Sequence, residues 1–548
     1  MYITKSSTNL ICKSVLFLVL IPLSCTFNTN TNQDTLYVGN GAEVQDLDPA
    51  TVSGVTEHRV LSSLFEGLTS LDPKSLQPIS AVAETWDISD DKKLYTFHLR
   101  KNAFWSNGEP VTSIDFLNSW KRILSPKLSA EYAYLLFCIK NAKQYYEGHI
   151  EDFNKVGVKI IDDYTLQVEL EYPTAYFLKM QVHNIWYPIH KKTIEKYGNF
   201  DERNNPWTHA GKHISNGPYQ LIEWIPNKII KVRKNPYYWN KESVAISNIY
   251  FYPIDNQMTE ERFFRIGYLD LTSTIPLRKL DYYRINRPES LLLYPYIGVY
   301  YYRINVKKAP LNNIFVRKAL AYAIDSSQIT KYILKDGETP ATHYVPNNIG
   351  DYLSPEIVRF NPKYARELLY QAGYPDGKNF PTIEILFNTS EAHKLIAEAI
   401  QRMWKQHLNI NVKLLNQDWK VYLSSLNQLD YQIARSAWIA DFLDPINFLE
   451  CFLSYSGNNR TGWANNEFDN KIEQAYHETD GKTRNRLMFE AEQILLDELP
   501  IIPIYFYTWK MLISSRVDNL NPNVLGYIRW QDLKIKEQNK SITLLDKR

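Results

Sequence analysis

Residues 362–415 alternate helical and strand-like patterns, and this alternation constrains the fold more than any other feature of the chain. Residues 362–372 are amphipathic and are followed by Gly373, the residue type at which helices commonly end. Three further segments continue the alternation: a strand over 380–387, a helix over 392–404 and a strand over 410–415. Strands that are separated by helices favour parallel pairing, so this region predicts an α/β lobe.

Segments outside residues 362–415 also predict helices and strands. The patterns indicate a strand over 95–100, a helix over 112–122, a hairpin over 158–170 and a helix over 316–324. At about 150 residues per domain, 548 residues correspond to three or four domains. The chain has no short internal repeat, and no long Pro, Gly or Ser linker separates the domains. We therefore expect domains that are each built from more than one segment of the chain and that share hinges.

The charge balance argues against a nucleic-acid partner. The chain has 62 Lys and Arg against 60 Asp and Glu, which leaves no net field toward nucleic acid or anionic membrane. Its 20 glycines form no phosphate-binding loop. Aromatic residues, by contrast, make up 14% of the chain. Tyr and Trp suit both cores and wet recognition surfaces, so composition alone leaves these two roles open.

The amino terminus resembles a secretory signal. Lys5 and Lys13 precede the apolar residues 15–23, and Ser24 and Cys25 follow; this run is too short to span a bilayer. We expect a signal peptide over 1–25, lipidation of Cys25 and a polar tether over 26–34. The alternative is ordinary cleavage near Asn28 with loss of Cys25.

Catalytic and metal-binding motifs are weak. Ser89 and Lys92 have the spacing of an acyl-transfer motif, but they lie in a charged turn without partner motifs. His209 and His213 have helical spacing with Gly211 between them and no evident third metal ligand. We expect no cofactor, no metal and no enzymatic activity. We also expect Cys138 and Cys451 to be buried free thiols.

Ordered motifs over most of the chain resemble a known family. They include EVQDLDP at 43–49, LFEGL at 64–68, AETW at 83–86, WSNG at 105–108, NGPY at 216–219, NPYYW at 235–239 and WIAD at 438–441. The pattern is similar to the peptide-binding branch of the extracytoplasmic solute-binding proteins of ABC importers. The resemblance runs from about Thr35 to the carboxyl terminus.

This resemblance implies a two-lobed α/β fold of the large peptide-binding type, with mixed sheets and hinge crossings. The expected lobe I combines residues 35–65, about 190–297 and about 509–548, with a small domain inserted over about 66–189. Lobe II is expected over about 298–508. The resemblance also implies a monomeric peptide receptor at the extracytoplasmic membrane surface, which delivers oligopeptides to the permease and ATPase subunits of an ABC importer.

The resemblance implies charged residues that hold the two ends of a peptide. Asp441 matches the carboxylate that binds the amino terminus, and Arg435 and His393 match groups that meet the carboxyl terminus. Taken without the resemblance, these residues are equally compatible with a helix cap, an ion pair and a solvent-facing histidine. Asp444, which precedes Pro445, is expected to cap a helix.

Aromatic residues complete the implied site. Trp419 and Trp438 match walls of side-chain pockets, while Tyr296, Tyr301 and Tyr507 lie at the expected lobe crossings and Tyr132 faces them from the small domain. Core packing is the alternative for each tyrosine. Ser53 and Val55 match a strand whose backbone pairs with an extended peptide. Trp86, Trp105, Phe116 and Trp239 are expected to belong to the core.

Three departures leave the ligand preference open. The resemblance implies a Cys pair at Gly298 and Ile439, which this chain lacks, and an acidic residue where Ser53 stands. An Arg is missing from the stretch after Trp419. A receptor for peptidoglycan-derived peptides therefore remains an alternative, followed by a receptor for nickel chelate or haem and by a peptide hydrolase.

Overall fold

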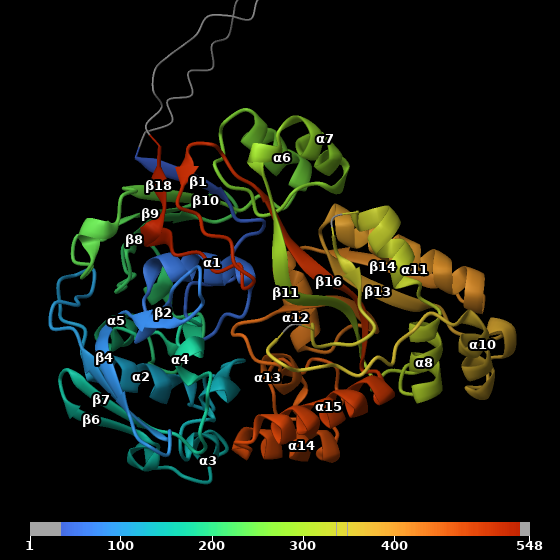
Figure 1. The fold of residues 1–548 in the computed structure, drawn as a ribbon, viewed down its shortest axis with the longest axis horizontal. Coiled ribbons are helices and arrows are strands. Elements are labelled where there is room, and N and C mark those ends of the chain that lie inside the picture. Colours follow the sequence, from blue (N-terminus) through green and yellow to red (C-terminus); the bar gives the residue numbers. More distant parts are fainter. Residues whose placement is uncertain (1–33, 336, 348, 537–548) are drawn as a thin grey trace, which may run out of the picture.

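Two lobes lie side by side in the computed structural model, which describes residues 34–536 apart from 336 and 348 (Figure 1). The predicted α/β architecture with mixed sheets is confirmed. The expected signal peptide, Cys25 and nearly all of the tether lie outside the described residues. No helix within the described part is long and apolar enough to cross a membrane.

Lobe I contains two four-stranded sheets. The first has the order β1-β10-β9-β8, with β1 parallel to β10 and the other pairs antiparallel. Its strands are β1 (Thr35–Gly39), β8 (Tyr219–Ile225), β9 (Ile229–Lys234) and β10 (Asn248–Tyr252). The helices α1 (Val55–Leu64), α6 (Gln257–Arg265) and α7 (Leu280–Asn286) and the short strands β17 (Val517–Asp518) and β18 (Lys534–Ile535) accompany it.

The second sheet of lobe I is antiparallel, with the order β4-β5-β7-β6. Its strands are β4 (Ala83–Ile88), β5 (Leu94–Leu99), β6 (Val158–Asp162) and β7 (Thr165–Glu169), and β2 (Thr69–Leu71) pairs with β3 (Pro78–Ser80) beside it. The helices are α2 (Ser113–Ile123), α3 (Ala142–Tyr146), α4 (Phe177–Met180) and α5 (Lys191–Tyr197). The predicted strand, helix and hairpin correspond to β5, α2 and β6–β7. A capping box between Thr112 and Asp115 starts α2.

Lobe II is built on one mixed sheet with the order β12-β16-β11-β15-β13-β14. Its strands are β11 (Leu291–Ile304), β12 (Thr339–Pro340), β13 (Ile383–Asn388), β14 (Val412–Gln417), β15 (Ile433–Ile439) and β16 (Ile501–Leu512). β13 pairs in parallel with β14, as the alternation over 362–415 predicts, and it also pairs in parallel with β15.

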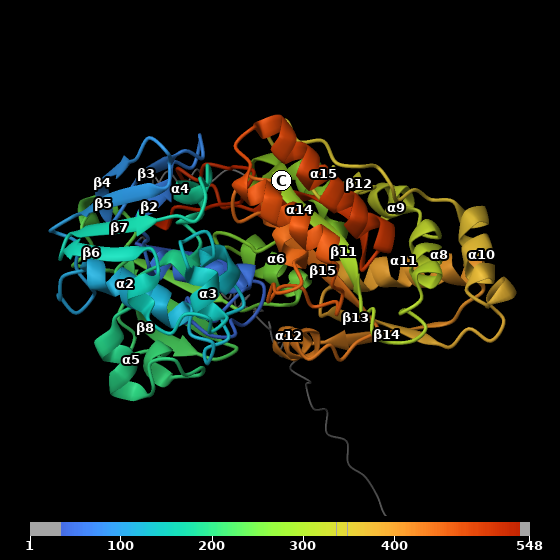
Figure 2. The same cartoon turned by 90° about the horizontal axis from the view of Figure 1, so that it is seen from below.

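Helices cover this sheet, and α8 and α10 lie at the end farthest from lobe I (Figure 2). The helices are α8 (Ile314–Tyr322), α9 (Ser326–Gln328), α10 (Pro362–Gln371), α11 (Glu391–Leu408), α12 (Trp419–Asn427), α13 (Ile446–Leu449), α14 (Asn466–His477) and α15 (Gly481–Glu498).

The long strands β11 and β16 pair antiparallel between the lobes (Figure 1). Their register shifts between Pro295 and Val299, a bulge that redirects the chain at Tyr296. Gly298 then lies opposite Ile439 of β15, the two positions at which the resemblance implies a Cys pair. A Cβ at Gly298 would lie 2.3 Å from the Ile439 side chain, so glycine permits this close approach.

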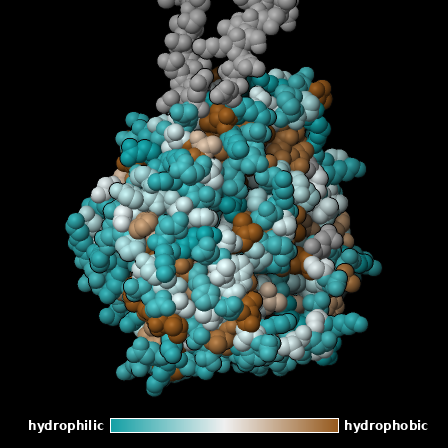
Figure 3. Space-filling view, turned by 60° about the vertical axis from the view of Figure 1, so that its left-hand side comes forward, coloured by the Kyte–Doolittle hydropathy of each residue, from teal (hydrophilic) through white to brown (hydrophobic). Residues whose placement is uncertain are grey.

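Much of the aromatic content is in the core. Trp105 and Phe116 are buried as expected, whereas Trp86 and Trp239 are only partly buried. Cys138 and Cys451 are buried free thiols, which confirms the prediction. Hydrophilic residues dominate the outer face seen in Figure 3, where hydrophobic residues form small separate groups.

Candidate functional site

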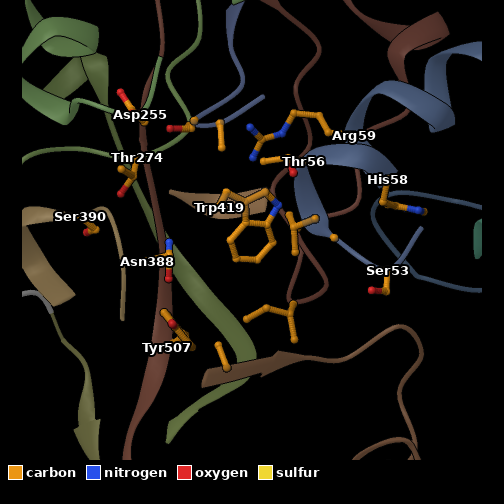
Figure 4. A pocket seen from close by; sticks show the side chains of 18 of the residues that line it. Ser53, Thr56, His58, Arg59, Asp255, Thr274, Asn388, Ser390, Trp419 and Tyr507 are labelled. Carbon is orange, nitrogen blue, oxygen red and sulfur yellow. The ribbon is translucent and has the colours of Figure 1, made fainter. Parts of the chain in front are cut away.

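A cavity of about 1030 Å³ lies between the lobes and is lined by residues of both. Ten of the eleven predicted binding residues line it: Ser53, Val55, Tyr132, Tyr296, His393, Trp419, Arg435, Trp438, Asp441 and Tyr507. They come from positions up to 454 residues apart, and Figure 4 shows several of them around the Trp419 ring. Folding therefore gathers most of the predicted site at one place.

Asp441 lies two residues beyond the end of β15 and is held by Asn447 of α13. The Asn447 side-chain oxygen accepts a hydrogen bond from the Asp441 backbone N–H at 2.9 Å, and its Nδ2 lies 3.4 Å from Asp441 Oδ2. Trp438 Nε1 donates to the same Asn447 oxygen at 3.1 Å. Asn447 thus orients the carboxylate and the neighbouring indole together.

The Asp441 carboxylate has no firm cationic partner. Within the described residues its one acid–base contact within 4.0 Å is with His183 Nε2, at 3.6 Å. Burial, and then His58, hold the pKa of His183 well below its usual range, so His183 is neutral. Burial raises the pKa of Asp441 to about 7, although the Asn447 hydrogen bond lowers it. A cationic group of a ligand would relieve this uncompensated charge.

Arg435 of β15 is a half-buried cation at another part of the cavity. Its guanidinium donates to the Tyr507 hydroxyl at 3.0 Å and to Asn388 Oδ1 at 3.3 Å, and lies 5.0 Å from the Tyr300 ring centre. Within the described part of the chain, no carboxylate lies within 4.0 Å of it. His393, in the first turn of α11, lies 3.5 Å from the Tyr300 hydroxyl. This region can therefore accept an anionic group.

Aromatic rings form much of the wall between these charged groups. Tyr132 lies 4.4 Å from the His183 ring and 6.1 Å from Trp438, and Tyr296 lies 6.4 Å from Tyr507. Trp419 is the first residue of α12, next to its cap Asp418. Such rings offer apolar contact that is not directional, so they accommodate side chains of different shapes.

Two expectations about this site are wrong in their geometry. Tyr301 does not line the cavity, because its ring packs edge-on against Tyr344 and Phe452 in the core of lobe II. Val55 is not in a strand; it is the first residue of α1, and the extended backbone ends at Gly54. Helical burial of later residues in α1 outweighs the strand preference of Val55.

His183 and Arg59 are among the cavity residues that sequence reasoning missed. Arg59 lies four residues after Val55 in α1, so both occupy one helix face. Treating residues 53–55 as a strand concealed this signal. His183 gave no signal in the sequence, because only the fold brings it to Asp441.

Polar contacts join the lobes beside the cavity. Glu131 of lobe I forms an ion pair with Arg460 of lobe II and accepts hydrogen bonds from Asn427 at 3.1 Å and Ser53 at 2.7 Å. We call Glu131 and Arg460 the inter-lobe pair. Other contacts cross the same boundary, including the ion pair of Lys143 with Glu473 at 2.8 Å.

Comparison with known proteins places these features in context. Residues 77–460 match the family described as bacterial extracellular solute-binding proteins, family 5 middle. The dipeptide-binding protein DppE of Bacillus subtilis is 36% identical over 519 residues, covering 92% of both chains. The structure of OppA of Haemophilus influenzae in complex with RPPGFSPFR has a TM-score of 0.87 and 34% identity, covering 92% of this chain and 99% of that chain.

Two structures of the murein tripeptide binding protein MppA, the first of them from Escherichia coli, differ in how well they superpose on this chain. One has a TM-score of 0.85 at 32% identity, covering 91% of this chain and 98% of its own. The form described as unliganded and open has a TM-score of 0.61 at 31% identity, covering 92% and 98%. Together with the inter-lobe pair, this difference indicates that the lobes of the present structure are closed.

Proposed function

Because this chain belongs to family 5 of the bacterial extracellular solute-binding proteins, we propose that it is a receptor that captures oligopeptides between its lobes and delivers them to an ABC importer. The relatives named for binding dipeptides, oligopeptides and murein tripeptide support peptides as its ligands. A relative titled as an oligopeptide ABC transporter supports permease and ATPase subunits as its partners.

One observation carries the proposal: the cavity between the lobes holds a carboxylate and, apart from it, a guanidinium, and neither has a firm partner of opposite charge among the described residues. Asp441 is suited to the α-ammonium group of a peptide, and Arg435 with His393 to its terminal carboxylate. Aromatic walls supply contact with side chains of many kinds. A peptide is a zwitterion with variable side chains, which matches this arrangement.

The direct test is to identify what the purified protein carries. Ligand released by denaturation would be analysed by mass spectrometry, and we expect linear peptides with free amino termini. Cross-linked peptides that contain diaminopimelate would favour the peptidoglycan alternative, which the similarity to MppA supports. Recovery of a metal chelate or haem without peptide would overturn the proposal.

The remaining features of the proposal concern location and chemistry. We place the protein at the extracytoplasmic membrane surface, attached through lipid on Cys25, as a monomer without catalytic activity.

Ser89, the candidate nucleophile of the acyl-transfer motif, lies in the turn between β4 and β5, and its hydroxyl donates to Asp91 at 2.5 Å. A peptide that is recovered intact after incubation with the protein would support a purely binding role.

We expect peptide affinity to fall as the pH is lowered. Asp441 must be ionised to pair with an ammonium group, and burial raises its pKa to about 7. Below that pH, the bound ammonium group of the peptide favours the ionised form of Asp441, so peptide binding releases a proton from Asp441. Affinity should fall by up to about tenfold per pH unit between about pH 7 and about pH 5.5. Calorimetry near pH 6 in two buffers of different ionisation enthalpy measures the released proton; no release would contradict the role of Asp441.

We expect Glu131→Gln to weaken all peptides by a similar factor. The inter-lobe pair is intact only when the lobes are closed, so its loss shifts the protein toward open forms. An effect of about 1–3 kcal/mol is expected for a partly buried charge pair. Calorimetry measures the lower peptide affinity, and small-angle scattering of the ligand-free protein measures the shift toward open forms.

Lys143→Gln, which breaks a more exposed inter-lobe pair, is the matched control and should have a smaller effect on peptide affinity. Unchanged affinity of the Glu131 variant would contradict the role of this pair.

A further inference from the structure

Arg59 is a further cation that lines the cavity, separate from Arg435. It lies in the second turn of α1, and its guanidinium points toward the Trp419 ring (Figure 4). The side chain makes one hydrogen bond, a long contact of 3.4 Å from Nη1 to the carbonyl oxygen of Gly39. Within the described residues no carboxylate lies within 4.0 Å of it. Most of the five donors of this guanidinium are therefore available to a ligand.

The acidic residues near Arg59 are already engaged elsewhere. Both Glu260 oxygens are bonded to Ser273, at 2.8 Å from its backbone N–H and 2.8 Å from its hydroxyl. Glu57 accepts from the Gln45 backbone N–H at 2.7 Å and from the Thr56 hydroxyl at 2.7 Å. Burial raises the pKa of both carboxyl groups, to about 7 for Glu260. Glu260 is within electrostatic range of Arg59, but no carboxylate of the described residues forms an ion pair with this guanidinium.

Two histidines connect Arg59 to the region of Asp441. His58, the residue before Arg59 in α1, stacks on His183 with 6.0 Å between the ring centres, and His183 Nε2 lies 3.6 Å from Asp441. All four residues line the cavity. Arg435 instead contacts Asn388 and Tyr507. A peptide whose amino terminus meets Asp441 and whose carboxyl terminus meets Arg435 would leave Arg59 opposite one of its first side chains.

We propose that Arg59 determines specificity by binding an acidic side chain near the amino terminus of the peptide. This inference rests on the proposed peptide-binding function. A guanidinium presents two parallel donors that match a carboxylate, and a partly buried cation gains most when that partner is supplied. The receptor therefore prefers peptides with Asp or Glu among their first three residues over peptides that are neutral there.

Calorimetry with alanine tetrapeptides that carry Glu or its neutral isostere Gln at the first, second or third position tests this. For one of these positions, the Glu peptide should bind about 10- to 100-fold more tightly than the Gln peptide. Arg59→Gln should remove that difference while leaving affinity for the Gln peptides nearly unchanged. Arg359→Gln, at an exposed arginine paired with Glu356, is the matched control and should retain the difference.

The outcomes separate the two proposals. Equal binding of Glu and Gln peptides to the unmodified protein would overturn the role of Arg59 and leave the peptide receptor intact. Failure of every tetrapeptide to bind would count against the receptor itself. A carboxyl-terminal amide series adds a third arm: if amidation weakens binding to the unmodified protein but not to Arg59→Gln, Arg59 binds the terminal carboxylate, and the inference is wrong.

Discussion

Asp441→Asn is expected to weaken binding of peptides with a free amino terminus by about 2–5 kcal/mol, or about 30- to 5000-fold in Kd. The carboxylate is half-buried, Asn447 orients it, and its nearest basic neighbour is a neutral histidine. Loss of the charge leaves a ligand ammonium group desolvated without a counter-ion. Isothermal titration calorimetry near pH 7 measures the effect.

Acetylated peptides provide the control for Asp441. Acetylation removes the ammonium charge, so an acetylated peptide should already bind weakly and should lose little more in the Asp441 variant. Because asparagine is isosteric, the contact with Asn447 can persist and the cavity should keep its shape. Equal losses for free and acetylated peptides would show that Asp441 supports the structure without recognising the amino terminus.

Asp48→Asn is expected to lower the free energy of unfolding by about 3–5 kcal/mol, the cost of breaking a buried ion pair on one side. Arg122 at the end of α2 donates to both oxygens of Asp48, at 3.0 and 2.6 Å, and both side chains are almost completely buried. The pair joins the loop after β1 to the helix beside the second sheet of lobe I. Differential scanning calorimetry and denaturant unfolding measure the loss.

The double variant Asp48→Leu/Arg122→Met separates charge from packing. Replacing both partners by apolar side chains removes the uncompensated charge, so this protein should be more stable than Asp48→Asn. A double variant that is as unstable as the single one would show that packing at this position, and not the ion pair, supports the structure. Peptide affinity should be retained in each folded variant, because neither residue lines the cavity.

Local patterns predicted the elements well where one periodicity extends over many residues. The strands expected over 380–387 and 410–415 are β13 and β14, displaced by two or three residues, and they pair in parallel. Prediction was wrong where it rested on the resemblance alone. The resemblance implied a strand that includes Ser53 and Val55, but burial of Val60, Leu61 and Leu64 starts a helix at Val55.

Ten of the cavity residues were predicted through resemblance, and the exceptions have physical causes. Tyr301 and Tyr300 are neighbours in a strand, so they point to opposite faces: Tyr300 toward Arg435 and Tyr301 into the core. A run of consecutive tyrosines does not indicate which face meets the cavity. Arg59 was missed because its position on the face of Val55 becomes visible only when the helix is known.

The sequence by itself determined the α/β alternation, the family and ten of the residues that line the cavity, because these depend on local periodicity and on ordered motifs. Only the tertiary structure decided which charges lack partners. Glu131 and Arg460 are 329 residues apart yet neutralise each other, whereas Asp441, Arg435 and Arg59 have no opposite charge of the protein firmly paired with them. Whether a charge is compensated depends on distances and burial between remote segments, and folding alone sets those distances.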